Sequence, residues 1–184
     1  MAIETLGVVG AGAMGAGIIE VAAKAGVTVV ARDISPEAVE AGQSRVESSM
    51  AKAVERGKLD EAARDAAVAK ITWTTDLADL AACDLVIEAA PEILELKKEI
   101  FSELDGILGP DAIIATNTSS YPIIEVAMCT RRPEQVVGMH FFNPATVMKL
   151  VEVISTQRTA EATKDGAAAF AADVLGKRVV HCKD

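Results

Sequence analysis

Apolar and polar positions near the start of the chain alternate between strand and helix patterns. Residues 6–9 form a short apolar run that ends in glycines, which predicts a buried strand. A helical pattern follows over about residues 14–24, and Gly26 stands where a glycine commonly closes a helix. The β-branched run 27–31 predicts a second strand, with Asp33 just beyond its end. This order is the beginning of an α/β chain.

A polar, alanine-rich stretch with helical periodicity covers residues 37–70. Ser35 is expected to cap its start, with Pro36 at the first helical position. Gly57 divides the stretch into two helices. Because the stretch is longer than a simple crossover needs, we predict a helical hairpin that projects from the sheet.

The rest of the chain continues the alternation. We expect strands at residues 71–74, 85–89, 112–116, 136–141, 150–154 and 178–181, and helices at residues 76–81, 94–104, 123–128 and 160–175. The loop carrying Asn143 and Pro144 is too short for a helical crossover, so strands 136–141 and 150–154 should be antiparallel neighbours. The pattern predicts one α/β domain over residues 1–184: a Rossmann, doubly wound, mainly parallel sheet with an inserted helical hairpin and an antiparallel C-terminal strand pair.

Composition and charge narrow the classes of function. Hydrophobic residues make up 51% of the chain, much of it alanine, which favours tightly packed helices. No uncharged apolar run reaches the roughly eighteen residues of a spanning helix, and the start lacks a signal-peptide pattern, so we expect no membrane segment. The net charge is −9 and no basic stripe is present, so we expect no nucleic-acid partner. Helix N-termini can still bind an anionic cofactor locally.

The cysteines fit neither a disulfide framework nor zinc spacing. Cys83, Cys129 and Cys182 lie far apart and are odd in number. We expect them to be small packing residues in a reducing cytoplasm, and we expect no metal site.

A glycine-rich turn between the first strand and the first helix matches the pattern G-x-G-x-x-G. Its residues, the candidate cofactor contacts, are Gly10, Ala11, Gly12, Ala13, Met14 and Gly15. In such a turn the first glycine permits the tight bend, the second lets a pyrophosphate approach the backbone, and the third lets helix and strand pack closely. The string alone is weak, since alanine- and glycine-rich chains produce it by chance, but its position after a strand and before a helix favours a dinucleotide site.

Asp33 supplies the acidic residue expected about twenty positions further on. A carboxylate there can accept hydrogen bonds from ribose hydroxyls and would repel a 2′-phosphate, which favours NAD over NADP. The neighbouring Arg32 weakens that preference. The alternative is a glycine turn followed by a chance aspartate.

His140 and Glu152 are the candidate catalytic pair. Oxidation of a hydroxyl needs a base for its proton, and His140 stands at the carboxyl end of a predicted strand, where ligands of open α/β sheets bind. An antiparallel connection centred near residue 146 places Glu152 opposite it, where a carboxylate can orient the imidazole. The alternative is a packing histidine and a solvent-facing glutamate. His181, with no acidic partner at useful spacing, is interpreted as structural.

Ser119 lies in the segment Asn117-Thr118-Ser119-Ser120, which follows another predicted strand. Its hydroxyl could donate a hydrogen bond to a substrate oxygen. These residues alone favour, slightly, the alternative of an ordinary helix N-cap cluster.

Together these motifs resemble the 3-hydroxyacyl-CoA dehydrogenase family. The matching stretches are residues 7–15, Val-Ile-Glu-Ala-Ala-Pro-Glu at 86–92, Thr-Asn-Thr-Ser-Ser at 116–120, and His-Phe-Phe-Asn-Pro at 140–144 followed by Glu152. The similarity runs through essentially the whole chain. The last string, with the serine segment before it, is far more specific than the glycine fingerprint.

The resemblance implies NAD-dependent, reversible oxidation of a 3-hydroxyacyl-CoA to a 3-ketoacyl-CoA. It implies that His140 is the catalytic base, Glu152 its paired carboxylate, and Ser119 a hydroxyl that contacts both substrate and cofactor. The residues it places near the nicotinamide end are Glu92, Lys97 and Asn143. A non-catalytic, crystallin-like NAD-binding protein and a dehydrogenase of sugar acids are the alternatives; the intact His140, Glu152 and Ser119 set argues against the first.

Members of this family continue into an all-helical C-terminal domain that completes the acyl-CoA site and carries a dimer interface. Because this chain stops at Lys183-Asp184, we expect that domain to be absent from it. The resemblance therefore predicts a homodimer for the longer protein, and a chain that binds NAD but turns over poorly alone.

Overall fold

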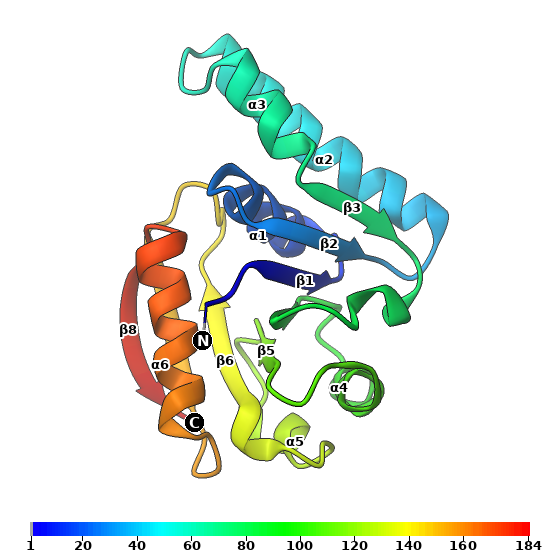
Figure 1. The fold of residues 1–184 in the computed structure, drawn as a ribbon, viewed down its shortest axis with the longest axis vertical. Helices are drawn as coiled ribbons and strands as arrows, with labels where there is room; N and C mark the ends of the chain where they lie inside the picture. The colour runs from blue at the N-terminus through cyan, green and yellow to red at the C-terminus, as the bar shows by residue number, and fades with distance from the viewer. Residues whose placement is uncertain (1) are drawn as a thin grey trace.

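Eight strands form one sheet in the computed structural model, which describes residues 2–184 (Figure 1). The strands are β1 (Thr5–Val9), β2 (Thr28–Arg32), β3 (Ile71–Thr74), β4 (Leu85–Glu88), β5 (Ile113–Thr116), β6 (Val136–Phe141), β7 (Leu150–Ser155) and β8 (Arg178–Lys183). Their order is β3-β2-β1-β4-β5-β6-β7-β8. Strands β1 to β6 are parallel, β7 is antiparallel to β6, and β8 is parallel to β7. The predicted fold class and antiparallel pair are confirmed, and β8 extends the reversed part of the sheet.

Six α-helices connect the strands. They are α1 (Ala13–Lys24), α2 (Pro36–Glu55), α3 (Glu61–Val68), α4 (Leu94–Ile107), α5 (Ile123–Ala127) and α6 (Glu161–Ala169). Short 3₁₀ turns cover Leu77–Leu80 and Pro133–Gln135, and a π-helical turn covers Phe170–Val174. The predicted helix 160–175 is therefore α-helical only in its first part, and the predicted helix 76–81 is a 3₁₀ turn. Apolar periodicity cannot separate these hydrogen-bond patterns over a single turn.

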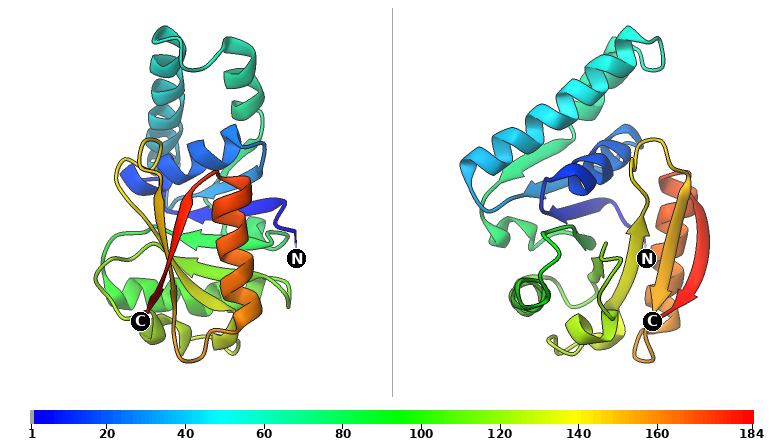
Figure 2. Two further views of the ribbon diagram at one scale, coloured as in Figure 1. Left: turned by 90° about the vertical axis from the view of Figure 1, so that its left-hand side faces the viewer. Right: turned by 180° about the vertical axis from the view of Figure 1, so that it is seen from behind.

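Helices cover both faces of the sheet, so the core has two layers (Figures 1 and 2). Along β4, Leu85 and Ile87 belong to the core beneath α1, whereas Val86 belongs to the core beneath α4. Alternate residues of a strand point to opposite faces, and a strand buried on both faces is apolar throughout. This explains why β4 and β5, which are buried along their whole length, are almost continuously apolar.

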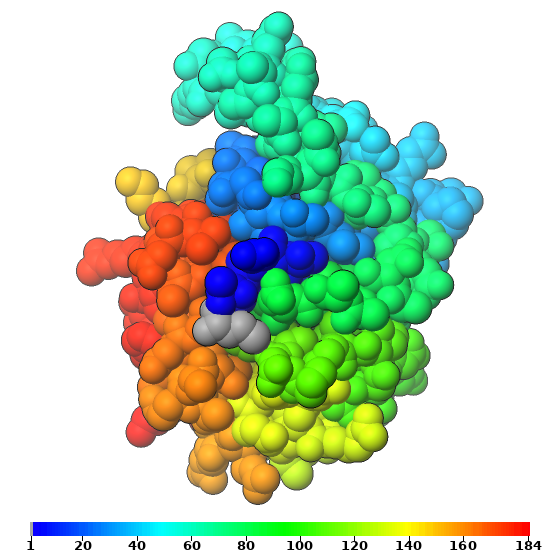
Figure 3. Space-filling model, viewed as in Figure 1, coloured from blue at the N-terminus to red at the C-terminus, as the bar shows by residue number. Residues whose placement is uncertain are grey.

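The predicted hairpin is formed by α2 and α3, and its tip projects from the body of the molecule (Figure 3). Nearer the sheet, both helices pack side chains in the core, namely Val46, Met50 and Ala67. Ser35 caps α2 by accepting a hydrogen bond from the Ala38 amide, with Pro36 at the first helical position. Gly57 has φ +64° at the break between the helices, a conformation that favours glycine. The hairpin therefore forms where capping and backbone preferences place it.

The three cysteines are free, but they do not share one environment. Cys83 is buried, and burial raises the pKa of its thiol to about 12, as expected of a packing residue. Cys129 and Cys182 are only half-buried. Within residues 2–184 no helix combines the length and apolarity needed to span a bilayer, and no cluster of potential metal ligands is found.

Candidate active site

The glycine turn packs the end of β1 tightly against the start of α1. Gly10 has φ +96°, and a Cβ added at Gly15 would lie 1.8 Å from the Gly10 carbonyl oxygen. A Cβ added at Gly12 would meet no atom within 4 Å. The turn therefore leaves no space for a side chain where α1 packs against β1, at Gly15, but is open to a ligand at Gly12.

A groove of about 450 Å³, the turn groove, lies beside this turn. Its lining includes Gly10, Gly12, Ala13, Met14 and Asp33. Gly12 caps α1 without any side-chain hydrogen bond, so no side chain competes for the first amides of the helix. Free amides at a helix N-terminus and an open backbone position suit a pyrophosphate, so the groove fits the dinucleotide that the sequence predicts.

Asp33 also accepts hydrogen bonds from two backbone amides, a structural role that the sequence did not reveal. Its Oδ2 accepts a hydrogen bond from the Ala11 amide at 2.7 Å, and its Oδ1 accepts one from Ile34 at 2.7 Å. The side chain of Ala11 is buried and contributes nothing to the groove lining. Asp33 therefore stabilises the glycine turn and also lines the turn groove. Because the Ala11 amide already donates to Asp33, it is not free to bind a ligand.

His140 and Glu152 face each other on β6 and β7, in the register that the sequence predicts. His140 Nδ1 lies 2.8 Å from Glu152 Oε2, and their side chains are 19% and 31% exposed. The Phe142 ring packs against the imidazole with centroids 4.6 Å apart. With Nδ1 held by the carboxylate, Nε2 is the nitrogen left for a ligand.

A second cavity of about 340 Å³, the polar cavity, brings most of the remaining candidates together. Its polar lining is Glu92, Lys97, Asn117, Ser119, His140 and Asn143. Met14, Ala89 and Ala90 line both this cavity and the turn groove, so the two adjoin along the carboxyl ends of the strands. Open α/β sheets bind their ligands at this edge.

Ser119 stands at the polar cavity in the segment after β5. Its amide donates to Glu92 Oε1 at 3.3 Å, and its side chain is exposed. Two residues earlier, Asn117 Oδ1 accepts a hydrogen bond from the Phe141 amide at 2.9 Å, which ties the end of β5 to the end of β6. The sequence signal for this role of Asn117 is its position directly after a strand.

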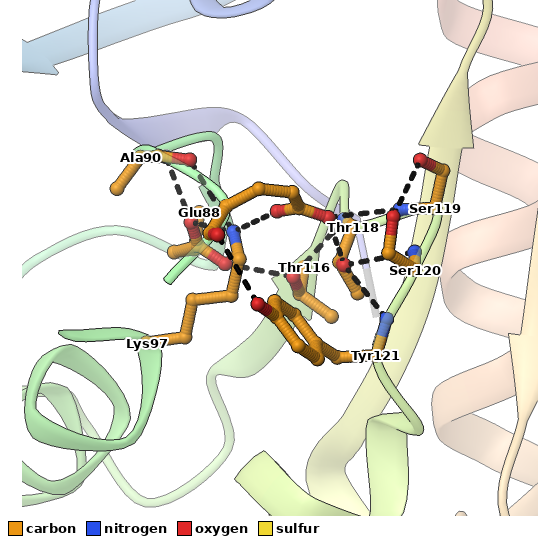
Figure 4. Close-up of polar contacts among 9 residues, drawn as sticks. Glu88, Ala90, Lys97, Thr116, Thr118, Ser119, Ser120 and Tyr121 are labelled. Atoms are coloured by element: carbon orange, nitrogen blue, oxygen red, sulfur yellow. Dashed lines mark hydrogen bonds and ion pairs between the residues drawn. The ribbon is translucent and has the colours of Figure 1, made fainter. Parts of the chain in front are cut away.

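A buried ion pair supports the polar cavity (Figure 4). Lys97 Nζ lies 2.8 Å from Glu88 Oε1 and 2.8 Å from Glu92 Oε2. Glu92 also accepts a hydrogen bond from the Thr118 hydroxyl. Sequence reasoning missed Glu88, although an acid at the end of an otherwise apolar strand is a signal that it needs a buried partner.

Glu92 should make the stability of the fold depend on pH. Burial raises the pKa of its carboxyl, but hydrogen bonds from Lys97 and Thr118 outweigh burial, so the pKa lies below its ordinary value of 4.5. Such a carboxyl stabilises the folded chain above the unfolded pKa, and this stabilisation disappears as the pH falls through the folded pKa. We expect the unfolding free energies of the native chain and Glu92→Gln to differ most at neutral pH and to converge below pH 4.5.

Urea denaturation across this pH range measures both free energies. Glu103→Gln, on the exposed side of α4, controls for the substitution itself. A native-to-variant difference that grows in acid would contradict the prediction.

Comparisons with known proteins agree with this geometry. Residues 5–184 match the family model described as 3-hydroxyacyl-CoA dehydrogenase, NAD binding domain. The chain is 49% identical, over its whole length, to a 3-hydroxybutyryl-CoA dehydrogenase of Mycobacterium tuberculosis, and it spans 64% of that protein. It superimposes on all of its length with the crystal structure of M. tuberculosis FadB2 at a TM-score of 0.99 and 49% identity, covering 65% of that chain.

A second solved structure, the (S)-3-hydroxybutyryl-CoA dehydrogenase PaaH1 from Ralstonia eutropha, gives a TM-score of 0.97 at 44% identity. All of this chain and 64% of that one are covered. The chain thus spans 64–65% of the length of each protein named here. The family model indicates NAD as the cofactor, and the open glycine turn is compatible with a dinucleotide. The chain belongs to the family of 3-hydroxyacyl-CoA dehydrogenase NAD-binding domains.

Proposed function

We propose that the chain is the cofactor-binding part of an enzyme that reversibly oxidises (S)-3-hydroxyacyl-CoA to 3-ketoacyl-CoA. The observation that carries the proposal is the His140–Glu152 pair, with its 2.8 Å contact, at the cavity that adjoins the turn groove. An imidazole backed by a carboxylate is a suitable base for a hydroxyl proton. The 3-hydroxybutyryl-CoA dehydrogenases among the relatives support a short acyl chain.

In this proposal His140 Nε2 takes the proton of the 3-hydroxyl group as the C3–H bond breaks and the carbonyl forms. A bound NAD would supply the acceptor for the hydride that leaves C3. Glu152 accepts the Nδ1–H, which fixes the imidazole tautomer and stabilises the imidazolium that forms. The Ser119 hydroxyl stands at the same cavity and would donate a hydrogen bond to the substrate oxygen.

We place the cofactor along the two adjoining hollows. The pyrophosphate would lie at the glycine turn, and Asp33 would accept hydrogen bonds from the adenosine ribose, which favours NAD over NADP. The nicotinamide end would then lie in the polar cavity. The residues that would surround it are Glu92, Lys97, Ser119 and Asn143.

We further propose that a helical C-terminal domain completes the acyl-CoA site, forms a homodimer and belongs to the same longer protein. The chain's 64% share of its relatives supports this. A cytoplasmic location is proposed on the free cysteines at positions 83, 129 and 182.

A substrate comparison tests the function. The full-length protein should oxidise (S)-3-hydroxybutyryl-CoA with NAD and leave a sugar acid such as gulonate unreacted. The reason is that, in the proposed enzyme, the C-terminal domain completes a binding site for the acyl-CoA thioester next to the polar cavity. The 184-residue chain should bind NADH yet show little turnover. The absorbance of the NADH that forms measures both rates. If the sugar acid is oxidised in preference to the thioester, the sugar-acid alternative replaces the proposal.

A further inference from the structure

Glu88, Glu92 and Lys97 form a charged cluster at the polar cavity, and the ion pair of Glu88 with Lys97 is almost fully buried (Figure 4). The side chains of Glu88 and Lys97 are 0% and 1% exposed, and that of Glu92 is 40% exposed. One ammonium shared by two carboxylates leaves this cluster with a net charge of −1. Lys97 and Glu92 line the cavity, whereas Glu88 does not.

Every polar atom of Glu88 and Lys97 has a partner. Lys97 Nζ donates to Glu88 Oε1 and to the Ala90 carbonyl oxygen, and it pairs with Glu92. Glu88 Oε1 also accepts from the Ala90 amide at 2.7 Å, and Glu88 Oε2 accepts from the Thr116 hydroxyl at 2.7 Å. A buried charge is tolerated only with such partners. The position of the Lys97 ammonium therefore depends on Glu88.

We propose that Glu88 is a positioning residue that holds the Lys97 ammonium at the polar cavity and biases that cavity toward the oxidised cofactor. The proposal rests on the placement of the nicotinamide ring proposed above. The oxidised ring carries a positive charge and the reduced ring is neutral. A cluster of net charge −1 attracts only the oxidised ring, and loss of the Glu88 charge makes the cluster neutral.

The size of the bias follows from Coulomb's law. At an effective dielectric constant of about 20, a unit charge about 12 Å from another changes a binding constant by about tenfold, and screening by solvent lowers this toward about threefold. The two carboxylates oppose one ammonium, so removing either should act in the same direction.

Glu88→Gln tests the proposal in the 184-residue chain, because glutamine keeps the shape and loses the charge. Its amide oxygen can accept from Lys97 and Ala90, and its amide nitrogen can donate to Thr116. Calorimetric titration gives the Kd of NAD⁺ and of NADH. We expect the ratio of the two, NAD⁺ over NADH, to rise about threefold to tenfold. An unchanged ratio overturns the proposal.

Thr116→Val is the matched control. It removes a hydrogen bond to the same carboxylate without changing any charge, so the ratio should stay at the native value. A shift in Thr116→Val equal to that in Glu88→Gln would assign the effect to packing and overturn the proposal. If Glu88→Gln does not fold, Glu92→Gln is measured in its place. An unchanged ratio of the NAD⁺ and NADH Kd values in Glu92→Gln would likewise overturn the proposal.

Glu92→Gln separates this inference from the proposed function, because Glu92 lines the polar cavity and carries the other negative charge of the cluster. If neither Glu92→Gln nor Glu88→Gln changes the ratio, the placement of the nicotinamide ring itself fails. If Glu92→Gln raises the ratio while Glu88→Gln does not, only the role of Glu88 fails.

Discussion

Replacing His140 with glutamine should lower kcat of the full-length protein about 10²- to 10⁴-fold, the range typical of general acid–base catalysis. Glutamine can still donate a hydrogen bond to Glu152, but it cannot take up a proton near neutral pH. The affinity for NADH should stay close to native, because the glycine turn and Asp33 form the separate turn groove. Steady-state rates with (S)-3-hydroxybutyryl-CoA and NADH titration measure the two quantities.

His181→Gln provides the same chemical change on the exposed edge strand β8 and should leave kcat at the native value. Glu152→Gln should also lower kcat, because the imidazolium loses its stabilising carboxylate. Since Glu152 acts through His140, the double variant should be no slower than His140→Gln alone. Native turnover by His140→Gln would remove the base assignment, and a further loss in the double variant would give Glu152 an independent role.

Alanine at Gly12 should weaken NADH binding about tenfold or more, equivalent to about 1.4 kcal/mol or more, in a chain that folds normally. The added methyl group meets no protein atom within 4 Å, and Gly12 has φ −64°, which alanine adopts freely. The methyl group would instead occupy the open side of the turn, where we place the pyrophosphate. Thermal unfolding should show a Tm near the native value, and NADH titration should show the loss.

Alanine at Gly15 is the matched variant with the opposite expectation. Its methyl group would lie 1.8 Å from the Gly10 carbonyl oxygen, so α1 must move away from the turn. Overpacking of this kind costs about 3 kcal/mol, whereas the better helix propensity of alanine returns only about 1 kcal/mol. We therefore expect a lower Tm as well as weaker NADH binding. A Gly12→Ala chain that binds NADH normally would show that the pyrophosphate does not approach this turn.

The alternation of strands and helices, the hairpin and the reversed strand pair could all be predicted from the sequence, because each depends on local interactions. Ser35, Pro36 and Gly57 act on the backbone within a few residues of themselves. The opposition of His140 and Glu152 is local in the same sense, since one short loop joins the two strands. Register within a hairpin-like connection follows from its length and from the apolar alternation of both strands.

Other features were decided only by the tertiary structure, because they depend on how strands and helices pack against one another and not on spacing along the chain. Glu88 becomes a buried partner of Lys97 when α4 packs on the sheet, and Thr116 reaches the same carboxylate because β5 lies beside β4. The contact of Asp33 with the Ala11 amide requires β1 and β2 to be neighbours. The pattern of apolar and polar residues predicts toward which face of a strand or helix a side chain points. Strand order and helix packing determine which polar group of another element it contacts.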